Sequence, residues 1–235
     1  MIIIPTFQEA GSILPLLSGL RAALPAARLL VVDDQSPDGT ADLVDHAQRA
    51  DPGIALRVRS GPRGLREAVV EGMGWALDQP AVAWVGQLDA DGSHPVSALP
   101  PLLCALQGAG LALGCRYMPG GGVQGWAAHR RALSWGGNRY ARAWLGLPLR
   151  DLTGGLKLWR AAALRRVEPA TLTSRGYAFQ IELGQRAARA GLRVVEVPFT
   201  FTERQAGRSK MSLGIAVEAA LRVPALRLRP WSPRA

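Results

Sequence analysis

The chain has 235 residues, a length typical of one large domain, and 48% of them are hydrophobic, which is enough for a sizeable core. No run of about 18 apolar residues occurs, so the sequence predicts no membrane-spanning helix. The apolar N-terminus is too short for a signal peptide and lacks its basic start. The two cysteines, Cys104 and Cys115, match no metal-ligand spacing, and we expect core thiols in a reducing cytoplasm.

The net charge of +10 is unevenly distributed along the chain. Residues 1–115 hold 12 acidic and 7 basic side chains, a net charge of −5, whereas residues 116–166 hold 10 basic side chains and one acidic, a net charge of +9. Residues 204–235 hold seven basic side chains and one acidic, a net charge of +6. A nucleic acid, an anionic membrane surface, phosphorylated substrates or a solvated arginine-rich surface would each account for the basic stretches.

The first 115 residues alternate between apolar strand patterns and amphipathic helix patterns. This order predicts an α/β fold with a mostly parallel central sheet and helices on both faces. Ser36 is expected to cap a helix that has Pro37 at its first position. The predicted strands are 2–4, 29–32, 55–58, 81–88 and 111–114, and further helices are predicted at 10–24, 64–77 and 96–107.

The second half carries different patterns. After a flexible loop at 119–122, aromatic and apolar residues recur at helical spacing over 126–147, interleaved with arginines. This pattern fits a helix at a membrane interface and a helix that faces the core equally well, and the glycine pair at 136–137 weakens the helix prediction. Residues 211–235 form a basic amphipathic tail, in which Pro224 is expected to limit any single helix.

Polar side chains follow three of the predicted strands, at 5–9, 33–34 and 89–91. Ligands of parallel sheets bind at the carboxyl ends of the strands, so we expect these clusters to lie together. Asp89 and Asp91 follow a buried strand, where two like charges resist burial. They are suited instead to a divalent cation, Mg²⁺ or Mn²⁺, which takes one or two carboxylates together with phosphate oxygens of a substrate.

Several motifs together resemble one enzyme family, and the resemblance extends from Ile2 to about Ser212. The first three motifs resemble the nucleotide-sugar half of family 2 inverting glycosyltransferases, and the others narrow the resemblance to polyprenol-phosphate (dolichol-phosphate) mannose synthases. The first three are PTFQE at 5–9, VDDQSPDGT at 32–40 and DADGSHP at 89–95; the others are GCRY at 114–117, DLTGG at 151–155, GYAFQIE at 176–182, VEVP at 195–198 and ERQAGRSKMS at 203–212.

The resemblance implies a glycosyltransferase-A fold and metal-dependent, inverting transfer of mannose from GDP-mannose to a polyprenyl monophosphate. It implies a catalytic domain at 1–210, with a nucleotide-sugar half at 1–115 and an acceptor half at 116–210, followed by the tail. Asp91, Arg116 and Arg130 are the expected catalytic residues. The implied donor contacts are Pro5, Phe7, Glu9, Val32, Asp34, Asp89, Ala90, Asp91, Arg204 and Lys210; the metal ligands are Asp89 and Asp91; and Arg116, Arg130 and Ser134 receive the lipid phosphate.

The chain departs from the family pattern at four positions. Phe7 stands where Tyr is common, which keeps an aromatic ring and loses a hydroxyl. Ser93 stands where some members use Gln as a metal ligand, and a Ser would ligate weakly or through water. Gln35 and Gly92 replace a frequent Gly and a frequent Leu.

A lipid phosphate is already an anion near neutral pH, so this acceptor needs cationic positioning and no general base. Arg130 and Ser134 are four residues apart and share a helix face, and with Arg116 they would form a bidentate phosphate cradle. The three histidines are scattered, and we expect surface or structural roles for them.

Contact with the membrane that holds such an acceptor would be peripheral, at the cytoplasmic face, through residues 126–147 or the tail. A separate membrane-anchor protein is an open alternative. The runner-up function is a related transferase that moves glucose or another sugar from a UDP-sugar to a polyprenyl phosphate. A basic nucleic-acid-binding protein is the alternative from another class, but no nucleic-acid motif is present, so we expect no nucleic-acid partner.

Overall fold

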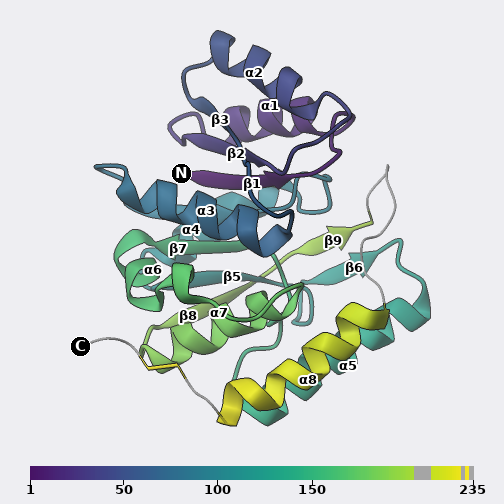
Figure 1. Ribbon diagram of the computed structural model, residues 1–235. Helices are drawn as coiled ribbons and strands as arrows, with labels where there is room; N and C mark the ends of the chain where they lie inside the picture. The colour runs from purple at the N-terminus through teal and green to yellow at the C-terminus, as the bar shows by residue number, and fades with distance from the viewer. Residues whose placement is uncertain (204–212, 229–230, 233–235) are drawn as a thin grey trace.

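The computed structural model describes residues 1–203, 213–228 and 231–232. Its centre is a seven-stranded sheet with the order β3-β2-β1-β4-β7-β5-β8 (Figure 1). All neighbouring strands pair in parallel except β7, which runs antiparallel to both β4 and β5. The strands are β1 (Ile2–Thr6), β2 (Leu29–Asp33), β3 (Ile54–Val58), β4 (Trp84–Gln87), β5 (Leu111–Cys115), β7 (Lys157–Arg160) and β8 (Val194–Pro198).

Helices cover both faces of the sheet, as the alternating order predicts. Ile2 and Ile4 of β1 face a core cluster formed with α1, α2 and α4, whereas Ile3 faces the opposite cluster with α3, α6 and α7. Because successive side chains of a strand point to opposite faces, a strand that is buried on both sides is apolar throughout. The helices are α1 (Ile13–Ala23), α2 (Thr40–Ala50), α3 (Leu65–Asp78), α4 (Leu99–Leu106), α6 (Ala161–Val167) and α7 (Ala178–Arg189).

Two further helices, α5 (Ala128–Leu145) and α8 (Leu213–Leu228), lie side by side at the end of the molecule opposite α1 and α2 (Figure 1). A short second sheet pairs β6 (Gly122–Gln124) with β9 (Thr200–Thr202) in parallel. Within the described residues, no helix is both long enough and apolar enough to cross a membrane.

Three predictions about helices and strands, and one about a cysteine, were wrong. Helix α2 begins at Thr40 after a left-handed Gly39 (φ 85°), and Ser36 does not cap it, because the Ser36 hydroxyl donates to Asp33 instead (2.6 Å). The strand predicted at 81–88 is only four residues long, since its partner β7 pairs with Trp84–Gln87 alone. Cys104 is exposed, and only Cys115 is a core thiol. Helix α8 continues through Pro224, because Val223 and Leu226 are buried against α5 and α7.

Helix α5 also continues through its two glycines, and the exposure of its side chains shows whether the aromatic residues face the core. Only a narrow face of Ser134, Asn138 and Ala141 is buried. Trp135 and Trp144 expose 54% and 44% of their surface, and Leu133 and Tyr140 are similarly exposed. The reading of this aromatic stripe as core is therefore wrong for the middle of the helix, although Trp126 and Leu147 at its ends are buried.

Candidate active site

The carboxyl ends of β1, β2 and β4 open into a first cavity of about 340 Å³. The cavity brings together the three polar clusters that the sequence places after these strands. It also includes the β3–α3 loop and the residues just before α7. Its lining residues are Pro5, Thr6, Phe7, Glu9, Asp34, Arg63, Gly64, Leu65, Ala68, Asp89, Ala90, Asp91, Gly176 and Tyr177.

Not every predicted donor contact reaches this cavity. Val32 is fully buried and packs in the core on the α3 side. Arg204 and Lys210 lie outside the described residues. The other seven predicted donor residues all line the first cavity.

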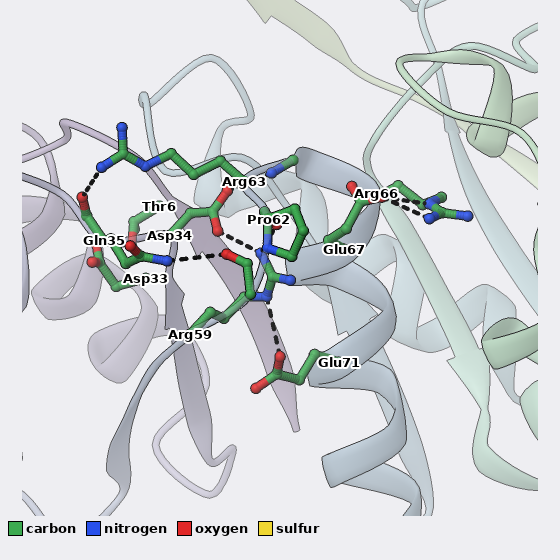
Figure 2. A network of polar contacts seen from close by, with 12 residues as sticks. Thr6, Asp33, Asp34, Gln35, Arg59, Pro62, Arg63, Arg66, Glu67 and Glu71 are labelled. Carbon is green, nitrogen blue, oxygen red and sulfur yellow. Dashed lines mark hydrogen bonds and ion pairs between the residues drawn. The ribbon is translucent and has the colours of Figure 1, made fainter.

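A polar network holds the acidic pair after β2 (Figure 2). Asp33 accepts hydrogen bonds from Thr6 (2.9 Å) and from the Ser36 backbone N–H (2.8 Å). Asp34 accepts from the Gly64 backbone N–H (2.6 Å) and pairs with Arg59. Because Asp34 is nearly buried, its paired guanidinium offsets the cost of its charge. The network therefore presents Asp34 at the cavity wall in one fixed orientation.

Arg63 is a cavity residue that no motif of the sequence indicates. Its guanidinium lies 4.8 Å from the centre of the Phe7 ring, and it donates to the backbone oxygen of Gln35 (3.0 Å). It enters the cavity from the β3–α3 loop, which has no polar motif of its own. The stacked pair gives the cavity a flat cationic wall, a surface that suits a nucleobase or a phosphate.

Asp89 and Asp91 line both the first cavity and a second one, so they lie where the two cavities meet. The loop that carries them is held by its own contacts: the Asp89 N–H donates to His94 Nδ1 (3.0 Å), and the Ser93 N–H donates to Asp91 Oδ1 (3.1 Å). No group of three or more His, Cys, Asp or Glu side chains with metal-binding geometry is present in the described part of the chain. A divalent cation here would be held by these two carboxylates and by substrate oxygens, which fits Mg²⁺ or Mn²⁺.

His94 and Ser93 are buried residues that support the loop that carries Asp89 and Asp91. Burial lowers the pKa of His94, with Asp89 opposing the shift, and its Nδ1 accepts a backbone hydrogen bond, so the ring is neutral. Its edge packs against Phe199 and Phe201, as expected of a structural histidine. Ser93 is buried and lines neither cavity, so its hydroxyl does not take the place of a glutamine metal ligand.

The second cavity, of about 290 Å³, lies between Asp89/Asp91 and the α5–α8 pair. It brings together all three residues predicted to receive a phosphate, Arg116, Arg130 and Ser134. The rest of the wall is largely apolar and comes from several helices. The other lining residues are Leu65, His94, Trp126, Leu133, Gly136, Gly137, Tyr140, Thr153, Gly155, Tyr177, Gln180, Ile181, Phe201, Ala220 and Val223.

Arg116 is less available than the predicted cradle requires. Its Nε and Nη2 donate to the two carboxylate oxygens of Asp151 (2.7 and 2.8 Å), and Nη2 also donates to Thr153 (2.9 Å). Burial alone would raise the pKa of Asp151, but Arg116 outweighs it and lowers that pKa, so the pair is ionic. Asp151 thus engages two of the Arg116 nitrogens, and Arg116 has at most one free nitrogen to offer to the predicted phosphate cradle.

Arg130 and Ser134 face the second cavity from one side of α5, as their spacing predicts. The Arg130 guanidinium lies 4.1 Å from the Trp126 ring centre and donates to Glu203 (2.8 Å), a carboxylate with 41% of its side chain exposed. The Ser134 hydroxyl accepts from the Tyr117 hydroxyl (2.7 Å). Because Glu203 is still largely solvated, an incoming phosphate can replace it as the partner of Arg130 at low cost.

Comparisons with known proteins agree with this geometry. The family model described as glycosyl transferase family 2 matches residues 1–168, so the chain belongs to the family 2 glycosyltransferases. An undecaprenyl-phosphate mannosyltransferase of Micrococcus luteus is 44% identical over 94% of this chain and 90% of that protein. A polyprenol monophosphomannose synthase of Mycolicibacterium smegmatis is 42% identical over 100% of this chain and 89% of that protein. Within family 2, the chain belongs with the polyprenol-phosphate mannose synthases.

Solved structures support the predicted glycosyltransferase-A fold. A glucosyl-3-phosphoglycerate synthase of Mycobacterium tuberculosis, solved with Mn²⁺, UDP and glucosyl-3-phosphoglycerate, has a TM-score of 0.67 at 18% identity, over 96% of this chain and 78% of that one. A mannosyltransferase of Pyrobaculum calidifontis, solved with GDP-Man and Mn²⁺, has a TM-score of 0.59 at 18% identity, over 96% and 68%.

Proposed function

We propose that this chain transfers mannose from GDP-mannose to a polyprenyl monophosphate, with inversion at the anomeric carbon. The observation that carries the proposal is the position of Asp89 and Asp91 at the junction of the two cavities. The first cavity has the strand-end position and the polar wall of a nucleotide site. The second offers cationic side chains and an apolar wall, which together match a phosphate that carries a lipid. The names of the two relatives point to the same donor sugar and the same acceptor class.

In the first cavity, Phe7 and Arg63 would hold the nucleoside, with Pro5, Glu9 and Asp34 around it. Asp89 and Asp91 would hold Mg²⁺ or Mn²⁺ against the diphosphate, a role supported by the Mn²⁺ in the two similar structures. When bound, the cation neutralises negative charge on the leaving nucleoside diphosphate. Arg204 and Lys210, near the end of the chain, are proposed to contact the donor phosphates; the motif resemblance alone supports this.

In the second cavity, Arg130 and Ser134 would hold the acceptor phosphate. A phosphate oxygen that is already ionised needs no base to take a proton from it, and the only histidine of this cavity has Nδ1 engaged with the backbone. Arg116, fixed by Asp151, would contribute charge and at most one free nitrogen. The protein's task is to hold the phosphate in line with the bond that breaks, on the face of the sugar opposite the nucleotide.

A transfer assay tests this function. With a short polyprenyl phosphate and Mn²⁺, we expect mannose transfer from GDP-mannose and much slower transfer from UDP-glucose, and chelation of the metal should abolish the reaction. A β-linked product identified by NMR would establish inversion. Faster transfer from UDP-glucose would favour the runner-up function. Salt-sensitive DNA binding without nucleotide-sugar binding would favour the nucleic-acid alternative.

For access to a lipid acceptor, we propose that the exposed side of α5 and α8 rests peripherally on the cytoplasmic face of the membrane. Trp135 and Trp144 of α5 and Leu221 of α8 are exposed there, and arginines of both helices lie among them. Exposed tryptophans prefer the membrane interface, and each basic residue near an anionic leaflet contributes about 1 kcal/mol. A separate anchor protein remains an alternative for the same task.

We expect the double substitution Trp135→Ser/Trp144→Ser to weaken co-sedimentation with anionic vesicles, most clearly in high salt. Salt screens the arginines within about 10 Å at 0.1 M, whereas insertion of an aromatic ring is not screened. The matched control is Val58→Ser, because Val58 is also 54% exposed but lies on β3, far from α5 along the sheet. Equal vesicle binding by the double variant and the control would show that this face is not the membrane contact.

A further inference from the structure

Lys157 is a fully buried basic residue at the start of β7. The chain has 28 basic residues, and only two of them, Lys157 and Lys210, are lysines. Nearly all basic residues of the chain are therefore arginines, including the cavity-lining Arg63, Arg116 and Arg130. A lysine differs from arginine in its compact ammonium group, which fits where a planar guanidinium does not. Position 157 therefore calls for a small cation in a confined space.

The ammonium has two hydrogen-bond partners. It donates to the backbone oxygen of Gly154, three residues earlier, and to the side-chain oxygen of Gln180 on α7. No carboxylate of the described residues lies within ion-pair distance of it. On β4, directly opposite Lys157 in the antiparallel register, the buried side chain of Gln87 has no hydrogen-bond partner among the described residues. Lys157, Gln87 and Gln180 thus form a buried polar layer at a place where apolar side chains would cost less free energy to bury.

Burying this polar layer has a cost in free energy. Burial lowers the pKa of Lys157 to about 7, and Asp151 only partly opposes the shift. Taking a charged group out of water costs several kcal/mol, and buried charges are often replaced by apolar side chains with no loss of stability. A fold that needed only packing would be at least as stable with a methionine here.

The two partners of Lys157 belong to the two segments that lie beside the junction of the cavities, the 151–155 loop and α7. Gly154 is in the 151–155 loop, whose Asp151 and Thr153 hold Arg116. In the same loop Gly155 approaches Asp89 so closely that an added Cβ would lie 3.2 Å from its Oδ1. Gln180 is in the first turn of α7 and itself lines the second cavity. It lies three residues after Tyr177, which lines both cavities.

We propose that Lys157 is a positioning residue for the transfer reaction: it ties the 151–155 loop to α7 and so sets the distance between Arg116 and the Asp89/Asp91 pair. This inference rests on the proposed function. The ammonium touches neither substrate; it acts through Gly154 and Gln180. A methionine would fill the same space without either hydrogen bond, so the loop and the helix would no longer be held at one separation.

The test is Lys157→Met, compared with the unchanged chain for melting temperature, for GDP·Mn²⁺ affinity by calorimetry, and for kcat and KM with a short polyprenyl phosphate. We expect an equal or higher melting temperature, GDP·Mn²⁺ affinity within about threefold, and a kcat/KM for the acceptor lower by about tenfold or more. Trp159→Phe, two residues further along the same face of β7, is the matched core control, and we expect it to keep normal transfer.

Normal transfer by Lys157→Met would overturn the inference. A loss of transfer that only parallels a fall in melting temperature, or an equal loss in Trp159→Phe, would also overturn it, because either result reports general core damage. If Lys157→Met does not fold, Gln180→Met removes one partner and keeps the lysine, and normal transfer by that variant would count against the inference. If the unchanged chain transfers no mannose to a polyprenyl phosphate, the proposed function fails instead.

Discussion

Asp91→Asn is expected to remove nearly all transfer activity while leaving the fold intact. The substitution keeps the shape of the side chain and its hydrogen bond to the Ser93 N–H, but it removes one of the two negative charges at the junction of the cavities. Losing that ligand should cost several kcal/mol of barrier, a decrease of about 10²- to 10³-fold in kcat. Steady-state kinetics with GDP-mannose, together with Mn²⁺ binding followed by electron paramagnetic resonance, measures both effects.

Asp45→Asn is the matched control, because Asp45 is a carboxylate on α2 that pairs with Arg49 and lines neither cavity. We expect its Mn²⁺ binding and turnover to be those of the unchanged chain. Near-normal turnover of Asp91→Asn at limiting Mn²⁺ would show that Asp91 is not a metal ligand.

Asp151→Ala is expected to lower the free energy of unfolding more than any of the other substitutions does. It leaves the Arg116 guanidinium buried without its carboxylate, and breaking a buried ion pair in this way costs about 3–5 kcal/mol. For a chain of this size, that corresponds to a fall in melting temperature of roughly 6–20 °C. At a temperature where the variant is still folded, we also expect a higher KM for the polyprenyl phosphate, because Arg116 loses its fixed orientation. Calorimetry and steady-state kinetics give the two numbers.

Glu182→Ala is the comparison that separates stability from acceptor binding. Glu182 and Arg186 form another buried ion pair, within α7, and neither lines the cavities. We expect this variant to lose stability and to keep its acceptor KM. If Asp151→Ala melts at the same temperature as the unchanged chain, the Arg116–Asp151 pair is not formed in solution.

Local sequence patterns predicted the five strands of residues 1–115 and most of the helices between them, because strands buried on both faces are apolar throughout. They did not predict β7, β8, α6 or α7 in the second half of the chain. The same patterns placed Phe7, Asp34 and the Asp89/Asp91 pair at strand ends, and the topology of a parallel sheet then brings such ends together. These predictions needed no long-range information, and the described structure confirms that those residues share one cavity.

The remaining features depend on contacts between distant segments. Nothing local indicates that Arg116 pairs with Asp151, 35 residues later, or that Arg63 lies over Phe7. The helical spacing does not indicate that the α5 aromatics are exposed, and the continuation of α8 through Pro224 follows from the burial of Val223. In each case, tertiary packing outweighed a local propensity.

The antiparallel β7 between β4 and β5 has a consequence for the order in which the chain can fold. Strand β5 is synthesised some forty residues before β7 and still earlier than β8, and these two are its only neighbours in the sheet. It must therefore wait, unpaired, until most of the chain has left the ribosome, and such long-range pairings are slow to form. During that wait β5 is an apolar strand with two open edges, the kind of segment that chaperones protect.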